Sequence, residues 1–306
     1  MPNALDIFQK VLRNVGYNIE ISDKGRFALT TISKFGSVAS LAYFLLSEQK
    51  RAVFEKYVSQ KPKSSKDNKT DVNTNGLYLK SDNRWYLDFA AIKSILQNDH
   101  KTSDFIYDLT NKSVLHRGLI LKCFVCRSTD WFGISELTNE FQCKRCGYKQ
   151  IYGKFNSLNK LEPGWYYKLD EIVYKAMSHN FVVPLLSIFR LQEKAESFDY
   201  APELELLDQR TNEQLLELDI CCIADGKLTI GEAKTANSLG KTSKEERVSV
   251  AKYYQLAEKI GASQVVFATA SEQWREETEK LITERFSNSL TKVILWNKNN
   301  LFGNQY

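Results

Sequence analysis

Four cysteines in two closely spaced pairs constrain the fold of this 306-residue chain more than any other feature. Cys123 and Cys126 form one Cys-x2-Cys pair, Cys143 and Cys146 form the other, and 16 residues separate the two. Thiolates at this spacing can surround one tetrahedral zinc ion, which requires two tight turns facing each other. The two remaining cysteines are adjacent, so the chain does not show a disulfide framework.

The stretch around these cysteines resembles a zinc ribbon, with short strands expected near Trp131 to Leu137 and Glu140 to Gln142. We therefore expect a four-cysteine zinc ribbon over residues 119–152. A module this small buries too little apolar area to fold unaided, so Zn²⁺ would be structural and would supply folding free energy. The alternative is that the four cysteines are buried without a metal.

Basic residues are concentrated around the cysteines. Between positions 117 and 154 there are seven Lys or Arg against three acidic residues, in a chain with a net charge of +5. Such a surplus permits contacts with nucleic-acid phosphates, although a solvated basic rim has the same composition. The candidates for phosphate contact are Arg127, Lys144, Arg145 and Lys149.

A second cluster of charged residues lies at 217–234, which is typical of two β-strands joined by an Asp225-Gly226 turn. Side chains alternate across a strand, so Glu232 and Lys234 must share a face, and Asp219 lies on the neighbouring strand. Two acids and a lysine would then converge at one end of a sheet. Carboxylate oxygens favour a hard divalent cation, and a lysine beside it suits an attacking water.

An acid-x-Lys triplet alone carries little information, because four others occur in the chain. What distinguishes Glu232-Ala-Lys234 is its place at the end of an apolar strand, beside a second strand that carries an acid. Charges buried there cost several kcal/mol unless they are paired or bind a metal. The alternative is a hairpin whose charged residues face solvent. The other triplets are Glu48-x-Lys50, Asp67-x-Lys69, Asp99-x-Lys101 and Asp225-x-Lys227.

Asp219 followed by Glu232-x-Lys234 resembles the PD-(D/E)xK nuclease superfamily, which has the restriction-endonuclease-like fold. The helix, three strands, helix and strand expected between Trp165 and Ala270 are similar to that family's core, with the three strands expected at about 198–207, 215–224 and 227–233. The resemblance implies that Asp219, Glu232 and the main-chain carbonyl of Ala233 bind Mg²⁺ or Mn²⁺, with Lys234 near the nucleophile. The family's proline before the first acid is absent here, where the chain has leucine.

The resemblance also implies two further site residues. Many members carry an acid on the first helix of the core, for which Glu171 is the candidate and Asp170 the alternative. Several members carry a glutamine on the helix after the lysine, and Gln255 shares a helical face with Val248 and Ala251. An ordinary surface glutamine would fit the same pattern.

The fold class predicted for the whole chain is α/β, with a mixed central sheet flanked by helices and preceded by the small β ribbon and a mainly helical N-terminal region. Residues 61–75 are polar and charged, which is typical of a flexible linker. The predicted divisions are a helical region at 1–60, the linker at 61–75, a mixed α/β segment at 76–118, the ribbon at 119–152 and a nuclease-like domain at 164–306.

We expect a Mg²⁺-dependent deoxyribonuclease, similar in domain content to bacterial restriction or phage-defence effectors. Its partners would be DNA and a protein that docks on the N-terminal helices. The competing interpretation is a non-catalytic nucleic-acid-binding or interaction protein with a degenerate nuclease fold. The longest apolar run, near residues 38–46, is too short for a membrane span, and no secretory signal is visible. We therefore expect a cytoplasmic location and no membrane contact.

Overall fold

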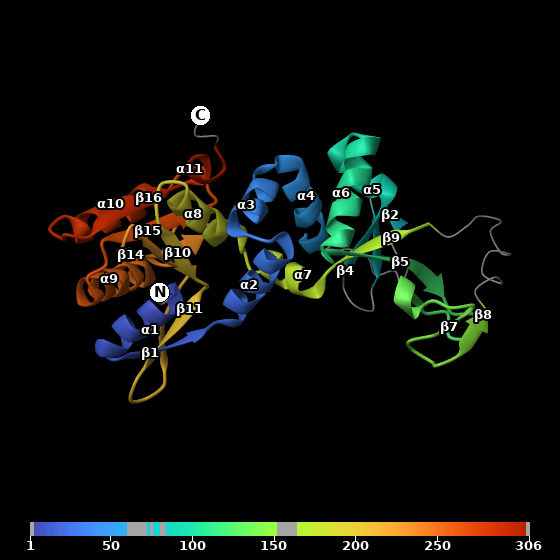
Figure 1. Ribbon diagram of the computed structural model, residues 1–306, viewed down its shortest axis with the longest axis horizontal. Coiled ribbons are helices and arrows are strands. Elements are labelled where there is room, and N and C mark those ends of the chain that lie inside the picture. The colour runs from blue at the N-terminus through green and yellow to red at the C-terminus, as the bar shows by residue number, and fades with distance from the viewer. Residues whose placement is uncertain (1–2, 60–71, 74–75, 80–83, 152–163, 304–306) are drawn as a thin grey trace. The chain divides into compact units, whose positions relative to one another are not determined.

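Two structural units make up the chain in the computed structural model, which describes residues 3–59, 72–73, 76–79, 84–151 and 164–303. Unit 1 combines Met1–Leu46 with Ser178–Tyr306, and unit 2 is Ser47–Met177. Figure 1 labels most elements of both units. The architecture is mixed α/β with several sheets, as expected from the sequence.

Unit 1 contains a mixed five-stranded sheet of order β10-β13-β14-β15-β16, in which the first pairings are antiparallel and the last two parallel. A second sheet, of order β1-β11-β12, is antiparallel. The elements are α1 (Ala4–Asn14), β1 (Tyr17–Ile21), α2 (Asp23–Phe35), α3 (Val38–Leu46), α8 (Val182–Gln192), β10 (Phe198–Ala201), β11 (Leu204–Asp208), β12 (Gln214–Leu218), β13 (Ile220–Ala224), β14 (Lys227–Lys234), α9 (Ser243–Ile260), β15 (Gln264–Thr269), α10 (Glu276–Phe286), β16 (Lys292–Trp296) and α11 (Lys298–Phe302).

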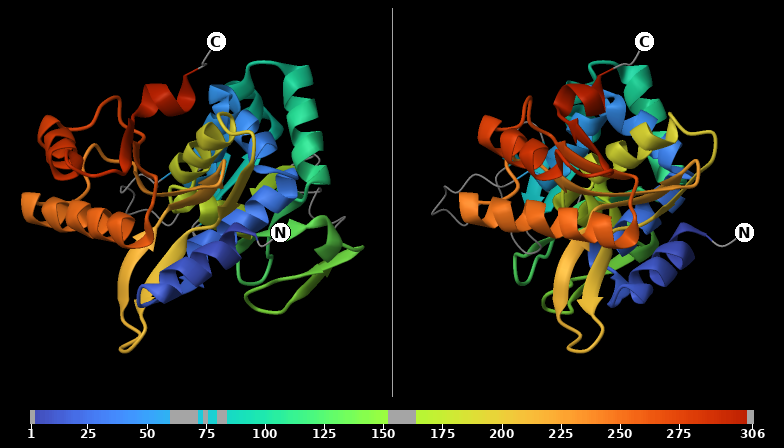
Figure 2. Two further views of the ribbon diagram at one scale, coloured as in Figure 1. Left: turned by 60° about the vertical axis from the view of Figure 1, so that its left-hand side comes forward. Right: turned by 90° about the vertical axis from the view of Figure 1, so that its left-hand side faces the viewer.

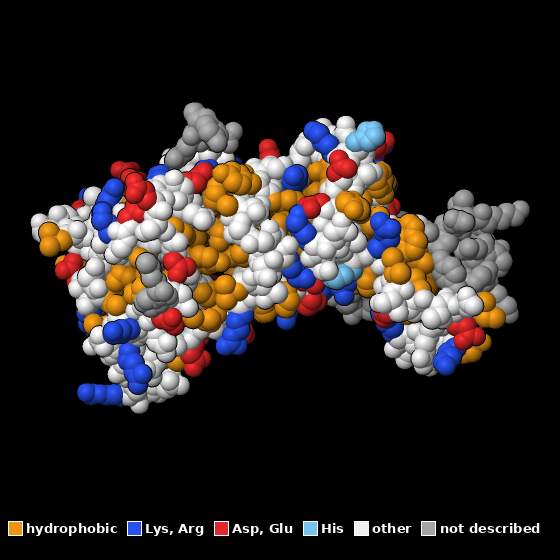
Figure 3. All heavy atoms as spheres, viewed as in Figure 1, with side chains coloured by type: hydrophobic (Ala, Val, Ile, Leu, Met, Phe, Trp, Pro, Cys, Tyr) orange, Lys and Arg blue, Asp and Glu red, His pale blue; other side chains and the backbone are white. Residues whose placement is uncertain are grey.

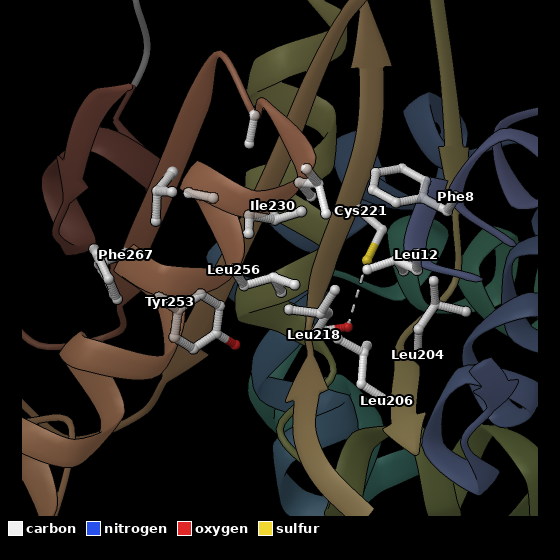
Figure 4. Close-up of a cluster of buried hydrophobic side chains, with 14 of the residues drawn as sticks. Phe8, Leu12, Leu204, Leu206, Leu218, Cys221, Ile230, Tyr253, Leu256 and Phe267 are labelled. Carbon is white, nitrogen blue, oxygen red and sulfur yellow. Dashed lines mark hydrogen bonds between the residues drawn. The ribbon is translucent and has the colours of Figure 1, made fainter. Parts of the chain in front are cut away.

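Alternation along the central strands explains the core of unit 1. Cys221, Ile230 and Val265 are aligned across β13, β14 and β15, and they face a core shared with α1, α9 and α10. The opposite face of these strands packs against α8, whose residues are nearly all buried. Figure 4 shows the first core, in which Phe8 from α1 lies close to Cys221 on β13. Helices therefore cover both faces of the central strands.

Two strands expected to be continuous are each divided between the two sheets. The expected strand at 198–207 becomes β10 and β11, separated by Pro202 and Glu203. Proline cannot donate to a sheet ladder, which explains the break there. The expected strand at 215–224 becomes β12 and β13, separated by Asp219. The two paired segments, β10–β11 and β12–β13, therefore both pass from one sheet to the other, and their breaks lie opposite each other.

The N-terminal residues do not form the separate 1–60 region that the sequence predicted. Helix α1 buries Phe8 and Leu12 completely in the core of unit 1, and β1 pairs with β11. The boundary falls after Leu46, and α4 (Glu48–Val58) belongs to unit 2. Tertiary burial of an amphipathic helix and one short strand therefore joins this segment to residues nearly 200 positions later in the chain.

Unit 2 holds a six-stranded sheet of order β2-β3-β4-β9-β5-β6, with every described pairing antiparallel, and a separate β7-β8 hairpin. Strand β9 lies between β4 and β5, although the cysteine-bearing segment separates it from them in sequence. The remaining elements are β2 (Val72–Asn73), β3 (Gly76–Leu79), β4 (Arg84–Asp88), α5 (Phe89–Leu96), α6 (Asp99–Asn111), β5 (Leu115–Lys122), β6 (Thr129–Gly133), a 3-10 turn (Ile134–Glu136), β7 (Glu140–Gln142), β8 (Lys149–Ile151), β9 (Tyr166–Leu169) and α7 (Glu171–Ser178).

The ribbon is built into unit 2 and does not stand beside it as a separate domain. Strands β5 and β6 belong both to the ribbon and to the six-stranded sheet. The predicted linker at 61–75 falls outside the described residues except for Val72–Asn73, which form β2. Among the described residues no single helix is long and apolar enough to cross a membrane, and two bent helix pairs reach that length and composition only jointly.

Candidate functional site

Asp219 and Glu203 lie opposite each other where the paired strands of unit 1 change sheets. Ala201 is aligned with Cys221 on one side of the break, and Leu204 is aligned with Leu218 on the other. The two acids occupy the break itself, so they face each other across it. Carboxylate oxygens of Glu203, Glu217 and Asp219 all lie within 4.8 Å of one another. This is a site that local sequence spacing does not reveal.

Glu232 joins Asp219 through the register of β13 and β14. Ile220 is aligned with Gly231, so Asp219 and Glu232 are the next pair at the end of that ladder. The backbone N–H of Ala233 donates to Asp219 Oδ2 at 2.8 Å. A side chain at Gly231 would place its Cβ 2.3 Å from the carbonyl oxygen of Val266 on β15, so glycine allows the close strand approach here.

Lys234 lies on the same face of β14 as Glu232, as the alternation of the strand predicted, and its ammonium pairs with Glu232 Oε1. Burial lowers the pKa of Lys234, but the charge of Glu232 and its hydrogen bond outweigh that effect and raise the pKa overall. Lys234 is therefore a stable cation at neutral pH. It can donate hydrogen bonds to a water or a phosphate, but it is unsuited to act as a base.

Tyr253 on α9 holds Glu232 from the other side. The phenol is completely buried, and its hydroxyl donates toward Glu232 Oε2. The hydroxyl oxygen also lies 2.7 Å from the carbonyl oxygen of Glu217 and 3.3 Å from that of Gly231. Figure 4 shows the ring among core side chains with its hydroxyl pointing toward Leu218. Tyr253 thus ties α9 to two strands and to the carboxylate.

The N-terminal segment contributes a second lysine to the carboxylates. Lys24 Nζ lies 2.9 Å from Glu217 Oε2 and 3.4 Å from Glu203 Oε1. Burial lowers the pKa of Lys24, but the hydrogen bond with Glu217 and the charges of both glutamates raise it overall. Ser22, which caps α2, donates its hydroxyl to Glu203 Oε1 at 2.8 Å. Residues from five separated segments therefore meet at one site.

Burial of Asp219 disfavours its ionised form unless a cation lies nearby. Asp219 as a residue is 9% exposed, and Glu232 is 7% exposed. Burial, and then the charge of Glu232, raise the pKa of Asp219 well above its usual range, although the N–H of Ala233 and the charge of Lys234 oppose the shift. Perturbed carboxylates beside a paired lysine are typical of functional sites. A divalent cation would favour the ionised form of both acids.

Two of the predicted residues are not brought to this site. Gln255 is exposed on α9, because it is two positions from the buried Tyr253 and so points to the opposite side of the helix. Glu171 belongs to unit 2, where its carboxylate pairs with Arg84, and that pairing lowers its pKa. The alternative, Asp170, caps α7 and lies 3.2 Å from His116 Nε2.

Sequence reasoning missed Glu203, Lys24 and Tyr253. Pro202 inside an apparent strand was the available signal for Glu203, since proline marks a break in a ladder. The spacing of Tyr253 with the buried Val250 and Ala257 was the signal that α9 presents this tyrosine inward. Lys24 had no signal in its own neighbourhood, because its partners lie more than 170 residues away.

The four cysteines of unit 2 converge as their spacing predicted. Their sulfur atoms all lie within 4.8 Å of one another. Cys123 Sγ is 3.6 Å from Cys146 Sγ, and Cys126 Sγ is 3.5 Å from Cys143 Sγ. Four sulfurs about 2.3 Å from a tetrahedral ion would be about 3.8 Å apart. The cluster can therefore hold a metal ion such as zinc.

The two cysteine pairs form equivalent turns. One pair closes the turn between β5 and β6, and the other closes the turn between β7 and β8. In each turn the N–H of the residue after the second cysteine donates to the carbonyl of the first cysteine, at 3.1 Å for Arg127 and 2.9 Å for Gly147. Both residues have positive φ, 63° and 73°. Glycine adopts this conformation freely, whereas Arg127 is strained there.

The environment of the cysteines favours the thiolate at two positions, because hydrogen bonds with Ser128 lower the pKa of Cys126 and contribute to lowering that of Cys143. Ser128 Oγ lies 3.3 Å from Cys143 Sγ. Burial raises the pKa of Cys143, but hydrogen bonds from Ser128 and from the backbone N–H groups of Cys146 and Arg145 lower it to about 6. Metal-binding sulfur is the thiolate, so this thiol is prepared for ligation near neutral pH.

Little apolar packing supports the ribbon. Its core consists of four buried side chains, Leu119, Leu121, Phe132 and Phe141. Figure 3 shows apolar side chains at the surface of the ribbon beside charged ones. The exposed apolar residues of the ribbon include Val125, which is 60% exposed, Tyr148 at 50% and Ile151 at 51%. A core this small requires an additional source of stability, as a metal would provide.

The basic residues of the ribbon differ in availability. Lys144 lies 2.7 Å from Glu136 Oε1 and over the ring of Phe132, so part of its charge is already compensated. Arg127, Arg145 and Lys149 are exposed.

No family model matches this chain, and no curated protein matches it either. The geometry of the two sites is therefore the guide to function.

Proposed function

We propose that unit 1 is a divalent-metal-dependent nuclease that hydrolyses DNA phosphodiester bonds, with a restriction-endonuclease-like fold of the PD-(D/E)xK type. The observation that carries this proposal is the arrangement of Asp219, Glu232 and Lys234 at one end of the β13–β14 ladder, with the main chain of Ala233 beside Asp219. The resemblance requires these groups on one face, and they come from two adjacent strands flanked by helices.

The charge of the site supports a divalent ion. Four carboxylates, those of Glu203, Glu217, Asp219 and Glu232, surround two ammonium groups, those of Lys24 and Lys234. If all six groups are ionised, two negative charges remain uncompensated in a partly buried position. One Mg²⁺ or Mn²⁺ would neutralise them, and carboxylate oxygens are the ligands that these ions prefer.

Each group has a distinct role in the proposed reaction. Asp219, Glu232 and the carbonyl of Ala233 would hold the cation, which when bound would make a water molecule more acidic and would stabilise negative charge in the transition state. Tyr253 fixes the orientation of Glu232 by its hydrogen bond. Lys234 remains protonated, so it would orient the attacking water and contact the phosphate without accepting a proton.

For unit 2 we propose a structural Zn²⁺ held by Cys123, Cys126, Cys143 and Cys146. The donor set supports this choice, because four thiolates at tetrahedral spacing are typical of structural zinc. No open coordination position would remain for chemistry. The ribbon would then present the exposed Arg127, Arg145 and Lys149 to nucleic acid.

The second candidate function is a nucleic-acid-binding protein with a degenerate nuclease fold. The acid and lysine set argues against degeneracy, since loss of catalysis usually removes one of its members. A cytoplasmic restriction or phage-defence effector is the biological setting that we propose for the active enzyme. Helix α1 offers little apolar surface to a docked protein partner, because its apolar residues are packed in the core of unit 1.

The test is cleavage of plasmid, linear duplex, single-stranded DNA and RNA with Mg²⁺ or Mn²⁺, against EDTA. Asp219→Ala and Lys234→Ala should each reduce metal-dependent cleavage by about 100-fold or more with the fold intact. Lys227→Ala is the matched control, because Lys227 is an exposed lysine at the start of the same strand. Cleavage that persists in EDTA, or that both active-site variants retain, would exclude the proposal.

A further inference from the structure

A groove of about 640 Å³ runs between the edge strand β12 and the first turns of α9 in unit 1. Figure 2 shows α9 lying beside the β11–β12 hairpin in both views. The side chains of Glu217 and Glu232 line the groove, so it opens directly onto the carboxylate site. A substrate that reaches these carboxylates from solvent can follow this groove.

Two lysines line the groove on the α9 side. Lys244 is exposed at the start of the helix. Lys252 donates to the carbonyl oxygen of Leu215 at 2.8 Å, which fixes its ammonium over the β12 wall and leaves two N–H donors for another acceptor. The acidic neighbour Glu245 is already engaged, because its carboxylate accepts the N–H of Lys241 at 2.7 Å and caps the helix.

Apolar side chains line the same groove between the lysines and the acids. Val248 on α9 is 49% exposed, and Leu215 on β12, which also lines the groove, is partly exposed. Phosphates of a duplex need only cations, since paired bases are stacked inside the helix. Unpaired bases in contrast expose apolar faces that favour such a lining. The combination of lysines and apolar side chains therefore fits one strand better than two.

The groove adjoins Glu217 and Glu232, so a strand bound along it would reach the carboxylate site. We propose that the groove binds an unpaired DNA strand, with Lys244 and Lys252 contacting phosphates and Val248 contacting bases. This inference rests on the proposed nuclease function of the adjoining carboxylates.

The experiment measures binding of a labelled oligothymidylate and of a hairpin duplex of equal length, by fluorescence anisotropy across a salt series. The protein is the full chain carrying Asp219→Asn, with Lys244→Ala, Lys252→Ala or Val248→Asp added. Lys280→Ala is the matched control, because Lys280 on α10 is 72% exposed and lies outside the groove. Cleavage by the same set without Asp219→Asn is followed in parallel.

We expect each groove lysine variant to weaken oligothymidylate binding by about tenfold at low salt, and to reduce the salt slope by about 0.7. Lys280→Ala should leave both quantities unchanged. In the cleaving series the same variants should raise KM with little change in kcat, since they do not touch the carboxylates. The duplex should bind at least about tenfold more weakly than the single strand.

The outcomes separate this inference from the nuclease proposal. Unchanged salt slopes for both lysine variants, or a duplex that binds as tightly as the single strand, would overturn the groove assignment even if the wild type cleaves DNA. A wild type that cleaves nothing, but whose oligothymidylate binding depends on these lysines, would retain the groove and remove the nuclease.

Discussion

The two candidate metal sites differ in how their ligands are gathered. In unit 2 all four cysteines lie within residues 123–146, on the turns of two hairpins. In unit 1 the charged groups come from α2, the β10–β11 break, β12, the β12–β13 break and β14, with α9 closing the site. The first site is a local pattern with almost no core of its own, and the second depends on a fully formed core.

This difference predicts opposite relations between metal and fold. The ribbon should need its ion in order to fold, because four buried apolar side chains cannot offset the entropy of ordering it. The carboxylate site should fold without its ion, because α9, β13 and β14 are held by extensive apolar packing. Its buried charges should make the metal-free state less stable than it otherwise would be.

The largest effect is expected at the ribbon. Cys143→Ser should remove the bound zinc and unfold residues 119–151, because structural zinc supplies about 10–16 kcal/mol of apparent binding free energy in small modules. Elemental analysis of zinc and hydrogen exchange of both units would measure this. Cys222→Ala is the control, since Cys222 is a buried thiol in unit 1. A Cys143→Ser protein that keeps zinc and a protected ribbon would break the comparison.

A smaller effect is expected at Tyr253, whose phenol is the link between α9 and Glu232. Tyr253→Phe should destabilise unit 1 by about 1.5–3 kcal/mol, because a buried charged acceptor loses its donor. It should also reduce metal-dependent cleavage by about 10- to 100-fold, as is common when a group that orients a ligand is removed. Denaturant unfolding and initial cleavage rates would measure the two effects.

The adjacent residue provides the matched control. Tyr254 packs against Phe286 and under Arg285, on another side of α9. Tyr254→Phe removes the same atom and should change stability by less than about 0.5 kcal/mol with no loss of cleavage. Equal effects of the two substitutions would show that Tyr253 has no special relation to Glu232.

Patterns among neighbouring residues in the sequence predicted those features of the fold that depend on short-range spacing. The alternation of β14 placed Glu232 and Lys234 on one face, and the cysteine spacing predicted two facing turns. Long-range contacts were not accessible in this way. Neither the pairing of β1 with β11 nor the reach of Lys24 to Glu217 has any counterpart in neighbouring sequence.

The errors also have physical causes. The helix acid expected at Glu171 came from assigning α7 to the nuclease domain, whereas its carboxylate pairs with Arg84 in unit 2. Gln255 was chosen with Val248 and Ala251 as neighbours, but Val248 is 49% exposed along the groove, whereas the side of α9 that contacts Glu232 is the buried side of Tyr253. Sequence periodicity predicted helix α9 correctly but did not identify the side that faces the carboxylates, because apolar residues occur on both sides of the helix.

The smallest effect concerns the free energy that the buried carboxylates cost the metal-free fold. Here the substitution is expected to stabilise the protein, whereas the substitutions above destabilise it. Because the pKa of Asp219 is raised in the folded state, its contribution to stability is fully present below the unfolded value of about 3.9 and is lost as pH rises through the folded value. Asp219→Asn keeps an acceptor for the N–H of Ala233 but carries no charge. In EDTA this variant should therefore match the wild type near pH 4 and exceed its stability at pH 8, by on the order of 1–2 kcal/mol. Thermal unfolding across that pH range measures the difference, and adding Mg²⁺ should stabilise the wild type alone. A variant less stable than wild type at pH 8 in EDTA would mean that Asp219 serves the fold and not a cation, and the contrast between the two metal sites would disappear.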